Sequence, residues 1–311
     1  MQQAVISVRD LEKSFGAVRA VAGLSFEVQR GEIFGLLGPN GAGKTTVLEI
    51  VEGLKKATSG TVRVLGLEPD RQAEAVKQRI GIQLQSAAYF EELTLTELLD
   101  LFGSFYPKRL DPAKLLRDVK LSDKARARVG QLSGGQKQRF SIAASIVNDP
   151  EIVFLDEPTT GLDPQARRNL WEFILELRRQ DRTVVLTTHY MEEAELLADR
   201  VAIVDAGKIV ACNTPRGLIK QLRNACMVMF MVSDGASGQD LTAELKKIAG
   251  VEDVERQEGN RYHIVVNSAD AALGPLLEWA RDRRLALSDL HVEPATLEDV
   301  FLHLTGKSLR E

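Results

Sequence analysis

Residues 38–45 read Gly-Pro-Asn-Gly-Ala-Gly-Lys-Thr. This stretch fits the pattern G-x-x-x-x-G-K-[ST], in which a glycine-rich loop holds nucleotide phosphates with its backbone N–H groups. The preceding segment, 33–37, is a short apolar run of the kind found in strands buried on both faces of a parallel sheet. The following segment, about 43–53, is predicted to be a helix. Strand, glycine loop and helix in this order predict an α/β nucleotide-binding domain.

Each residue of this loop has an expected task. Glycines let the backbone approach the phosphates, and the helix points its positive end at them. Lys44 is expected to bridge the β- and γ-phosphates, and the Thr45 hydroxyl to bind Mg²⁺. The alternative, an ordinary glycine-rich turn, does not explain the flanking strand and helix. The predicted nucleotide-binding residues are Gly38, Pro39, Asn40, Gly41, Ala42, Gly43, Lys44, Thr45 and Thr46.

Two further apolar runs lead into polar residues. Asp156 and Glu157 follow the run 152–155, and His189 follows the run 183–187. Ligands of open α/β sheets bind at the carboxyl ends of strands, so these side chains are expected beside the phosphate loop. Asp156 is predicted to hold Mg²⁺, Glu157 to polarise the attacking water, and His189 to contact the γ-phosphate. A helix cap or turn for the carboxylates and a structural role for the histidine are the alternatives.

The stretch Leu-Ser-Gly-Gly-Gln at 132–136 indicates a second anion site at the start of a helix predicted from about 135 to 148. Ser133 can cap this helix, whose N–H groups and dipole favour an anion. Two phosphate sites in one chain predict a head-to-tail dimer that sandwiches two nucleotides. A plain helix cap would explain Ser133 but neither the glycines nor Gln136. The residues predicted to contact nucleotide here are Ser133, Gly134, Gly135 and Gln136.

Composition excludes several classes of protein. With 44% hydrophobic and 27% charged residues, the chain can bury ordinary cores. Its net charge of −4 argues against a broad nucleic-acid surface, and no nucleic-acid partner is expected. Cys212 and Cys226 form neither a metal spacing nor a disulfide framework. No secretory signal or membrane-spanning run is expected. If the protein serves a membrane process, another chain must supply the spanning part.

The remaining patterns predict two domains, 1–222 and 223–311. In the first, strands are expected at 4–8 and 24–29 with a turn near Gly16 and Gly23, mostly helix over 88–148, a helix at 165–180, and a hairpin at 201–204 and 208–210. In the second, strands are expected at 226–232, 251–257, 261–267 and 285–292, and helices at 240–249, 270–284 and 296–304. This βαββαβ order, followed by a last helix, is the split βαβ or ferredoxin-like pattern.

Over about residues 4–222 the chain resembles the nucleotide-binding subunits of ATP-binding-cassette (ABC) transporters. The resemblance identifies the Walker A loop (38–45), the signature (132–136), the Walker B segment (152–157), the D-loop (161–163) and the switch residue His189. It implies a P-loop, RecA-like α/β cassette with an antiparallel β subdomain and an inserted helical subdomain at about 88–148. A small C-terminal α+β accessory domain, 223–311, follows the cassette.

The resemblance also assigns residues that the local chemistry does not. Gln85 matches the Q-loop glutamine, which contacts Mg²⁺ or the water and faces the membrane partner, with Gln83 as a rival for this assignment. Phe15 matches the aromatic residue that stacks on adenine, with a role in the core as the alternative. Asp163 belongs to the D-loop and is expected to contact nucleotide. The implied ligands are ATP and Mg²⁺, and the implied partners are a second copy and a separate integral-membrane permease at the cytoplasmic side of the cell membrane.

The segment 293–301 resembles the tail of the daunorubicin-resistance branch of exporters, so the chain is expected to be the ATPase subunit of an exporter. One alternative is a soluble ABC ATPase of translation or DNA repair. Such proteins usually carry two cassettes or a long coiled coil before the signature, whereas only residues 86–131 separate Gln85 from Leu132 here. The other alternative is a non-hydrolytic regulatory cassette. Against it argue the intact Lys44, Asp156, Glu157 and His189.

Overall fold

The computed structural model describes residues 4–83, 88–221, 226–233, 240–257, 260–266 and 268–306. The chain divides into two compact units, Met1–Pro215 and Arg216–Glu311. Helix α8 (Pro215–Gln221) lies at this division. Among the residues that the structure describes, no helix is long and apolar enough to cross a membrane.

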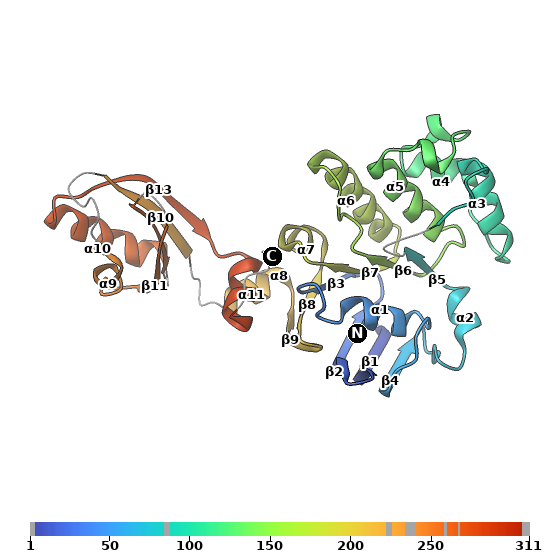
Figure 1. Ribbon diagram of the computed structural model, residues 1–311, viewed down its shortest axis with the longest axis horizontal. Helices are drawn as coiled ribbons and strands as arrows, with labels where there is room; N and C mark the ends of the chain where they lie inside the picture. The colour runs from blue at the N-terminus through green and yellow to red at the C-terminus, as the bar shows by residue number, and fades with distance from the viewer. Residues whose placement is uncertain are drawn as a thin grey trace. The chain divides into compact units, whose positions relative to one another are not determined.

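A six-stranded sheet forms the centre of the first unit (Figure 1). Its strand order is β5 (Ile80–Gln83), β6 (Ile152–Asp156), β7 (Thr183–Thr188), β3 (Ile33–Leu37), β8 (Arg200–Asp205) and β9 (Lys208–Asn213). The first five strands are parallel, and β9 pairs antiparallel with β8. Strands β3, β6 and β7 are buried throughout, as their apolar runs predict. Because these three strands are neighbours, their carboxyl ends meet at one edge of the sheet.

A second sheet, with the order β2 (Val18–Gln29), β1 (Ala4–Phe15) and β4 (Ser59–Val64), is antiparallel. Gly16 lies in the turn between β1 and β2, but the turn predicted near Gly23 is wrong, because Gly23 lies inside β2. There the pairing with β1 shifts register, and the φ of +84° at Gly23 suits glycine at such a bulge. Phe26 stacks on Phe34 with 5.2 Å between ring centres, which joins this sheet to β3.

The helices of the first unit follow clear local signals. They are α1 (Lys44–Val51), α2 (Ala73–Lys77), α3 (Leu95–Ser104), α4 (Pro112–Asp118), α5 (Gly134–Ser145), α6 (Pro164–Arg179) and α7 (Met191–Leu197). Thr94 and Glu97 form a capping box at the start of α3, and Asp111 caps α4. Figure 1 shows α3, α4 and α5 as one group, away from β1, β2 and β4. This group lies within the region predicted to be helical.

The second unit contains β10 (Cys226–Ser233), α9 (Thr242–Leu245), β11 (Val251–Arg256), β12 (Arg261–Val266), α10 (Ala269–Asp282), β13 (Ala286–Pro294) and α11 (Leu297–Thr305). The strand order β11-β12-β10-β13, antiparallel throughout, is that of a split βαβ unit. Phe230 and Tyr262 are fully buried in its core, with ring centres 5.9 Å apart. Helix α9 is shorter than the predicted 240–249, and the chain instead turns through Gly250, whose φ is +86°.

Candidate functional site

The loop between β3 and α1 packs too closely for side chains at two of its glycines. A Cβ atom at Gly38 would lie 2.2 Å from the Val204 carbonyl oxygen. Gly43 has a φ of +99°, and a Cβ atom there would lie 2.4 Å from the Ala20 carbonyl oxygen. The backbone of 38–45 is therefore held tightly against neighbouring segments, and only glycine fits at these positions.

Lys44 lies at the start of α1 and is buried. Its Nζ atom donates hydrogen bonds to the carbonyl oxygens of Gly38 (2.7 Å) and Pro39 (3.1 Å). The same atom lies 3.5 Å from Oε1 of Glu157. Burial lowers the pKa of Lys44, and the nearby Glu157 carboxylate acts in the opposite direction. The loop thus carries a partly desolvated cation held next to a carboxylate.

Asp156 is the last residue of β6 and lies beside α1. The Thr45 hydroxyl donates to Oδ1 of Asp156 at 3.3 Å, and the Thr187 hydroxyl donates to the same atom. Burial raises the pKa of Asp156, whereas these two hydroxyl groups lower it. Thr187 was not among the predicted site residues. The one signal for it in the sequence is a hydroxyl side chain that directly follows the apolar centre of β7, residues 184–186.

Glu157 lies in a strained turn, between Lys44 and His189. Its φ is +47°, which is uncommon for a residue with a side chain. Its N–H group donates to the carbonyl oxygen (3.2 Å) and to the hydroxyl (2.9 Å) of Thr187 on β7. The Thr160 hydroxyl donates to Oε2 at 3.1 Å. Nδ1 of His189 lies 3.4 Å from the same oxygen. The turn therefore places the carboxylate between Lys44 of the phosphate loop and His189.

The signature stretch and Asp163 are engaged in local caps. Ser133 Oγ accepts from the Gln136 N–H, and Gln136 Oε1 accepts from the Ser133 N–H at 2.9 Å. This capping box corrects the expectation that a cap leaves Gln136 unexplained. A Cβ atom at Gly135 would lie 3.0 Å from Ala166. Asp163 caps α6 through the Ala166 N–H. In the described part of the chain, no hydrogen bond or ion pair links these caps to Lys44 or to residues 156–157.

Phe15 lies at the end of β1 and is 46% exposed, so the alternative of a core aromatic is wrong. The ammonium groups of Lys13 and Lys55 lie 5.0 and 5.6 Å from its ring centre. Gln85 lies outside the described residues. Its rival, Gln83, is the last residue of β5 and is buried.

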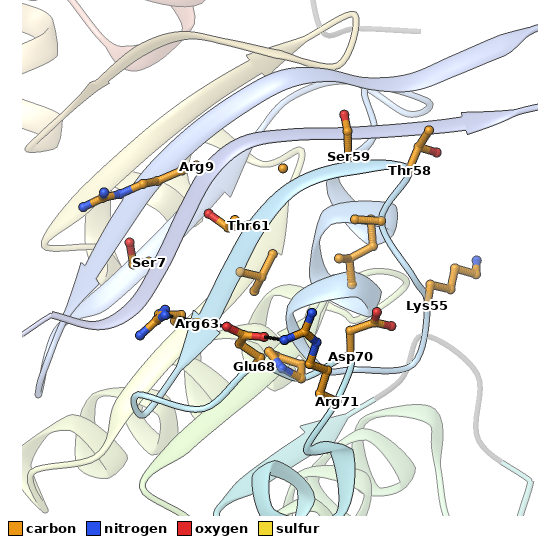
Figure 2. Close-up of a pocket in the computed structure, with 15 residues that line it drawn as sticks. Ser7, Arg9, Lys55, Thr58, Ser59, Thr61, Arg63, Glu68, Asp70 and Arg71 are labelled. Atoms are coloured by element: carbon orange, nitrogen blue, oxygen red, sulfur yellow. Dashed lines mark ion pairs between the residues drawn. The ribbon is translucent and has the colours of Figure 1, made fainter.

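A polar hollow of about 700 Å³ lies over β1, β4 and the segment 68–71, and Lys55 is one of the residues that line it (Figure 2). Glu68 forms ion pairs there with Arg63 (3.6 Å) and Arg71 (3.4 Å). The residues that line the hollow include none of the predicted site residues.

Comparison with known proteins identifies the family of the chain. Residues 21–160 match the family model described as ABC transporter. The chain is 39% identical to a Nod factor export ATP-binding protein I of Burkholderia lata over the whole of both chains. It is 37% identical to a daunorubicin resistance ATP-binding protein of Streptomyces coeruleorubidus, covering 95% of this chain and 93% of the other. It is 35% identical to a linearmycin resistance ATP-binding protein of Bacillus subtilis (strain 168), covering 99% and 100%.

Solved structures give the same answer for the fold. An ATP-binding subunit of an ABC transporter matches with a TM-score of 0.63 and 29% identity, over 70% of this chain and 92% of the other. A dimeric ATP-binding cassette bound to ADP and phosphate matches with a TM-score of 0.60 and 26% identity, over 67% and 98%. The first unit is a P-loop ATPase fold, and the cassettes of this group hydrolyse ATP to drive transport. The chain therefore belongs to the family of ATP-binding subunits of ABC transporters.

Proposed function

We propose that this protein powers an exporter, working as a nucleotide-sandwich dimer with a separate membrane permease. The observation that carries the site assignment is the Glu157 carboxylate between Lys44 and His189. The export direction is supported by three relatives, named for Nod factor export, daunorubicin resistance and linearmycin resistance. These names favour an exporter over a soluble ATPase of translation or repair.

In this proposal Lys44 binds the β- and γ-phosphates of ATP. Its ammonium group would exchange its contacts with the Gly38 and Pro39 carbonyl oxygens for phosphate oxygens. Negative phosphates favour the charged form of a lysine whose pKa burial lowers. Glu157 orients the attacking water and accepts its proton, while His189 contacts the γ-phosphate.

The oxygen atoms of Thr45 and Asp156 fit Mg²⁺, because this ion prefers hard oxygen ligands and usually takes one or two carboxylates together with phosphates. When bound, Mg²⁺ would neutralise charge on the β- and γ-phosphate oxygens. Thr187 would hold the Asp156 carboxylate in place through its hydroxyl hydrogen bond. Gln85 is proposed as a further ligand on resemblance alone.

The other contacts to nucleotide are proposed to come from two subunits. Phe15, between Lys13 and Lys55, would stack on the adenine of its own subunit. The segment 133–136 and Asp163 would face the nucleotide held by the second subunit, since helix N-termini favour anions. The permease would dock this dimer at the cytoplasmic face of the cell membrane.

The test is Glu157→Gln, which keeps the shape of the side chain and removes its charge. We expect ATP binding to be retained, hydrolysis to fall by about a hundredfold or more, and an ATP-bound dimer to accumulate in light scattering. The matched control is Glu192→Gln, since Glu192 is exposed. Normal turnover in the Glu157 variant would remove the basis of the proposal.

A further inference from the structure

Helix α6 contacts the segment that follows His189 at two points. The guanidinium carbon of Arg167 lies 4.4 Å from the centre of the Tyr190 ring. One turn further along the helix, Nε1 of Trp171 donates a hydrogen bond of 3.1 Å to Oε1 of Glu193. Residues four apart lie on one face of a helix, so a single face of α6 supports both side chains. The position of residues 190–193 therefore depends on α6.

Glu193 is fully buried, which is rare for a carboxyl group. Burial raises its pKa, and the hydroxyl groups of Thr188 and Thr159 act against this rise. Thr188 directly precedes His189, and Thr159 comes two positions after Glu157. The Glu193 carboxyl group thus interacts with hydroxyl groups from the two segments that carry the proposed catalytic pair.

His189 lies close to both Tyr190 and Glu157. Its ring centre lies 4.1 Å from that of Tyr190, and its Nδ1 lies 3.4 Å from Glu157 without hydrogen-bond alignment. Most buried polar groups in proteins are hydrogen-bonded. Within the described ranges, the buried atoms without a hydrogen-bond partner of good geometry include Thr159 Oγ1, Arg167 Nε, His189 Nδ1 and Glu193 Oε2. These groups belong to the residues that connect α6 with His189 and Glu157.

We propose that Glu193 is a positioning residue for ATP hydrolysis, which together with Arg167 and Trp171 holds His189 against Glu157. The inference rests on the proposed function, because it takes His189 and Glu157 as the pair at the γ-phosphate. Glu193 itself would not touch the nucleotide. Its loss would misplace the reacting groups and slow the chemical step, while ATP binding by the loop 38–45 would be retained.

The first test is Glu193→Gln in the full chain, with Glu192→Gln as the matched control. The glutamine keeps the size of the side chain and an acceptor oxygen for Trp171, but it cannot ionise opposite Arg167 as a carboxyl group can. We expect kcat to fall about tenfold or more, with KM for Mg-ATP within about threefold of wild type. The exposed Glu192 should tolerate the same change with kcat within about twofold. A raised KM with unchanged kcat, or an equal loss in the control, would overturn the proposal.

A second variant guards against a folding defect at the buried site. Arg167→Gln acts on a partly exposed side chain, and the exposed neighbour Arg168 supplies the control Arg168→Gln. We expect kcat to fall about three- to tenfold at Arg167 only. In the double variant Arg167→Gln/Glu193→Gln, the fold-loss in kcat should not exceed the product of the two single losses and should lie closer to the larger of them. This is expected because both residues position His189 through the same group of contacts.

Lys44→Ala in the same assay separates the two proposals. Normal hydrolysis by that variant would overturn the proposed function, and the positioning role with it. A different result would overturn the positioning role alone. In that case hydrolysis depends on Lys44, but kcat stays within about twofold of wild type in both the Glu193 and the Arg167 variants.

Discussion

Glu157 Oε2 lies 3.4 Å from Nδ1 of His189, although 31 intervening residues carry the chain through helix α6 and strand β7 between them. The other carboxylate oxygen lies 3.5 Å from Nζ of Lys44. Hydrogen bonds from the Glu157 N–H group to Thr187 fix the turn in which this carboxylate lies. The Glu157 side chain therefore connects the three segments that follow the neighbouring strands β6, β7 and β3.

Lys44→Ala should weaken ATP binding at least tenfold and abolish hydrolysis, because the variant loses the charge that balances the phosphates. Isothermal titration with Mg-ATP measures the affinity. The exposed Lys247 supplies the control Lys247→Ala, which should bind ATP normally. Equal affinity in the two variants would contradict the assignment of Lys44.

Ser133→Arg should abolish hydrolysis while leaving ATP binding to the single subunit nearly unchanged, because bulk at 133 would block closure of the dimer. The variant also loses a helix cap, at a cost of about 1 kcal/mol. Thr94→Arg is the control, since it removes the same kind of capping box from α3. An active Ser133→Arg homodimer, measured by phosphate release, would refute the role of this motif across the dimer.

Phe15→Ala should lower the affinity for ATP about three- to tenfold, whereas Phe15→Tyr should preserve it, because the stacking face is kept. Affinity for inorganic triphosphate should change in neither variant, since it has no adenine. Phe105→Ala removes another exposed phenylalanine and serves as the control. A loss of triphosphate binding in Phe15→Ala would mean that the ring acts on the phosphate loop and not on the base.

Glu52 makes the stability of the first unit depend on pH. Burial, with the charges of Asp156 and Glu49, raises the pKa of Glu52 from 4.5 to about 8. Between these values the folded state binds a proton that the unfolded state releases, so the free energy of unfolding falls as pH rises from about 5 through 8. Glu52→Gln should remove this loss and stabilise the protein at about pH 8.5 by on the order of a few kcal/mol. Urea unfolding at about pH 5.5 and 8.5 measures the free energy of unfolding of the variant and of wild type, with Glu192→Gln as the control.

A chain ending at Leu222 should bind ATP with the affinity of the full chain, because the second unit has its own core around Phe230 and Tyr262. We expect it to dimerise less readily, or to lose transport while keeping basal hydrolysis. Calorimetry, light scattering and a transport assay on both forms provide the measurements. A folded truncated chain that fails to bind ATP would show that the cassette depends on residues beyond 222.

Much of the fold could be predicted because its signals are local. Continuous apolar runs marked β3, β6 and β7, and Ser133 marked the start of α5, whereas the part of Gln136 in the cap became clear only in the structure. Gly23 misled the prediction, because a glycine inside a strand at a bulge has the same local pattern as one in a turn. Helix α7 carried no prediction, and the buried Glu193 on it reads in sequence as one more acidic residue of an exposed helix.

The phosphate loop and the chemistry of the residues after the buried strands can be recognised in the sequence alone. Such motifs act through short stretches of backbone whose conformation is set locally. Which of these groups come into contact depends on the tertiary structure. Glu157 reaches both Lys44 and His189, and Asp156 receives the Thr187 hydroxyl, because the sheet places β6, β7 and β3 side by side in an order that differs from their order in the chain. That order depends on packing between distant segments, and no local pattern encodes it.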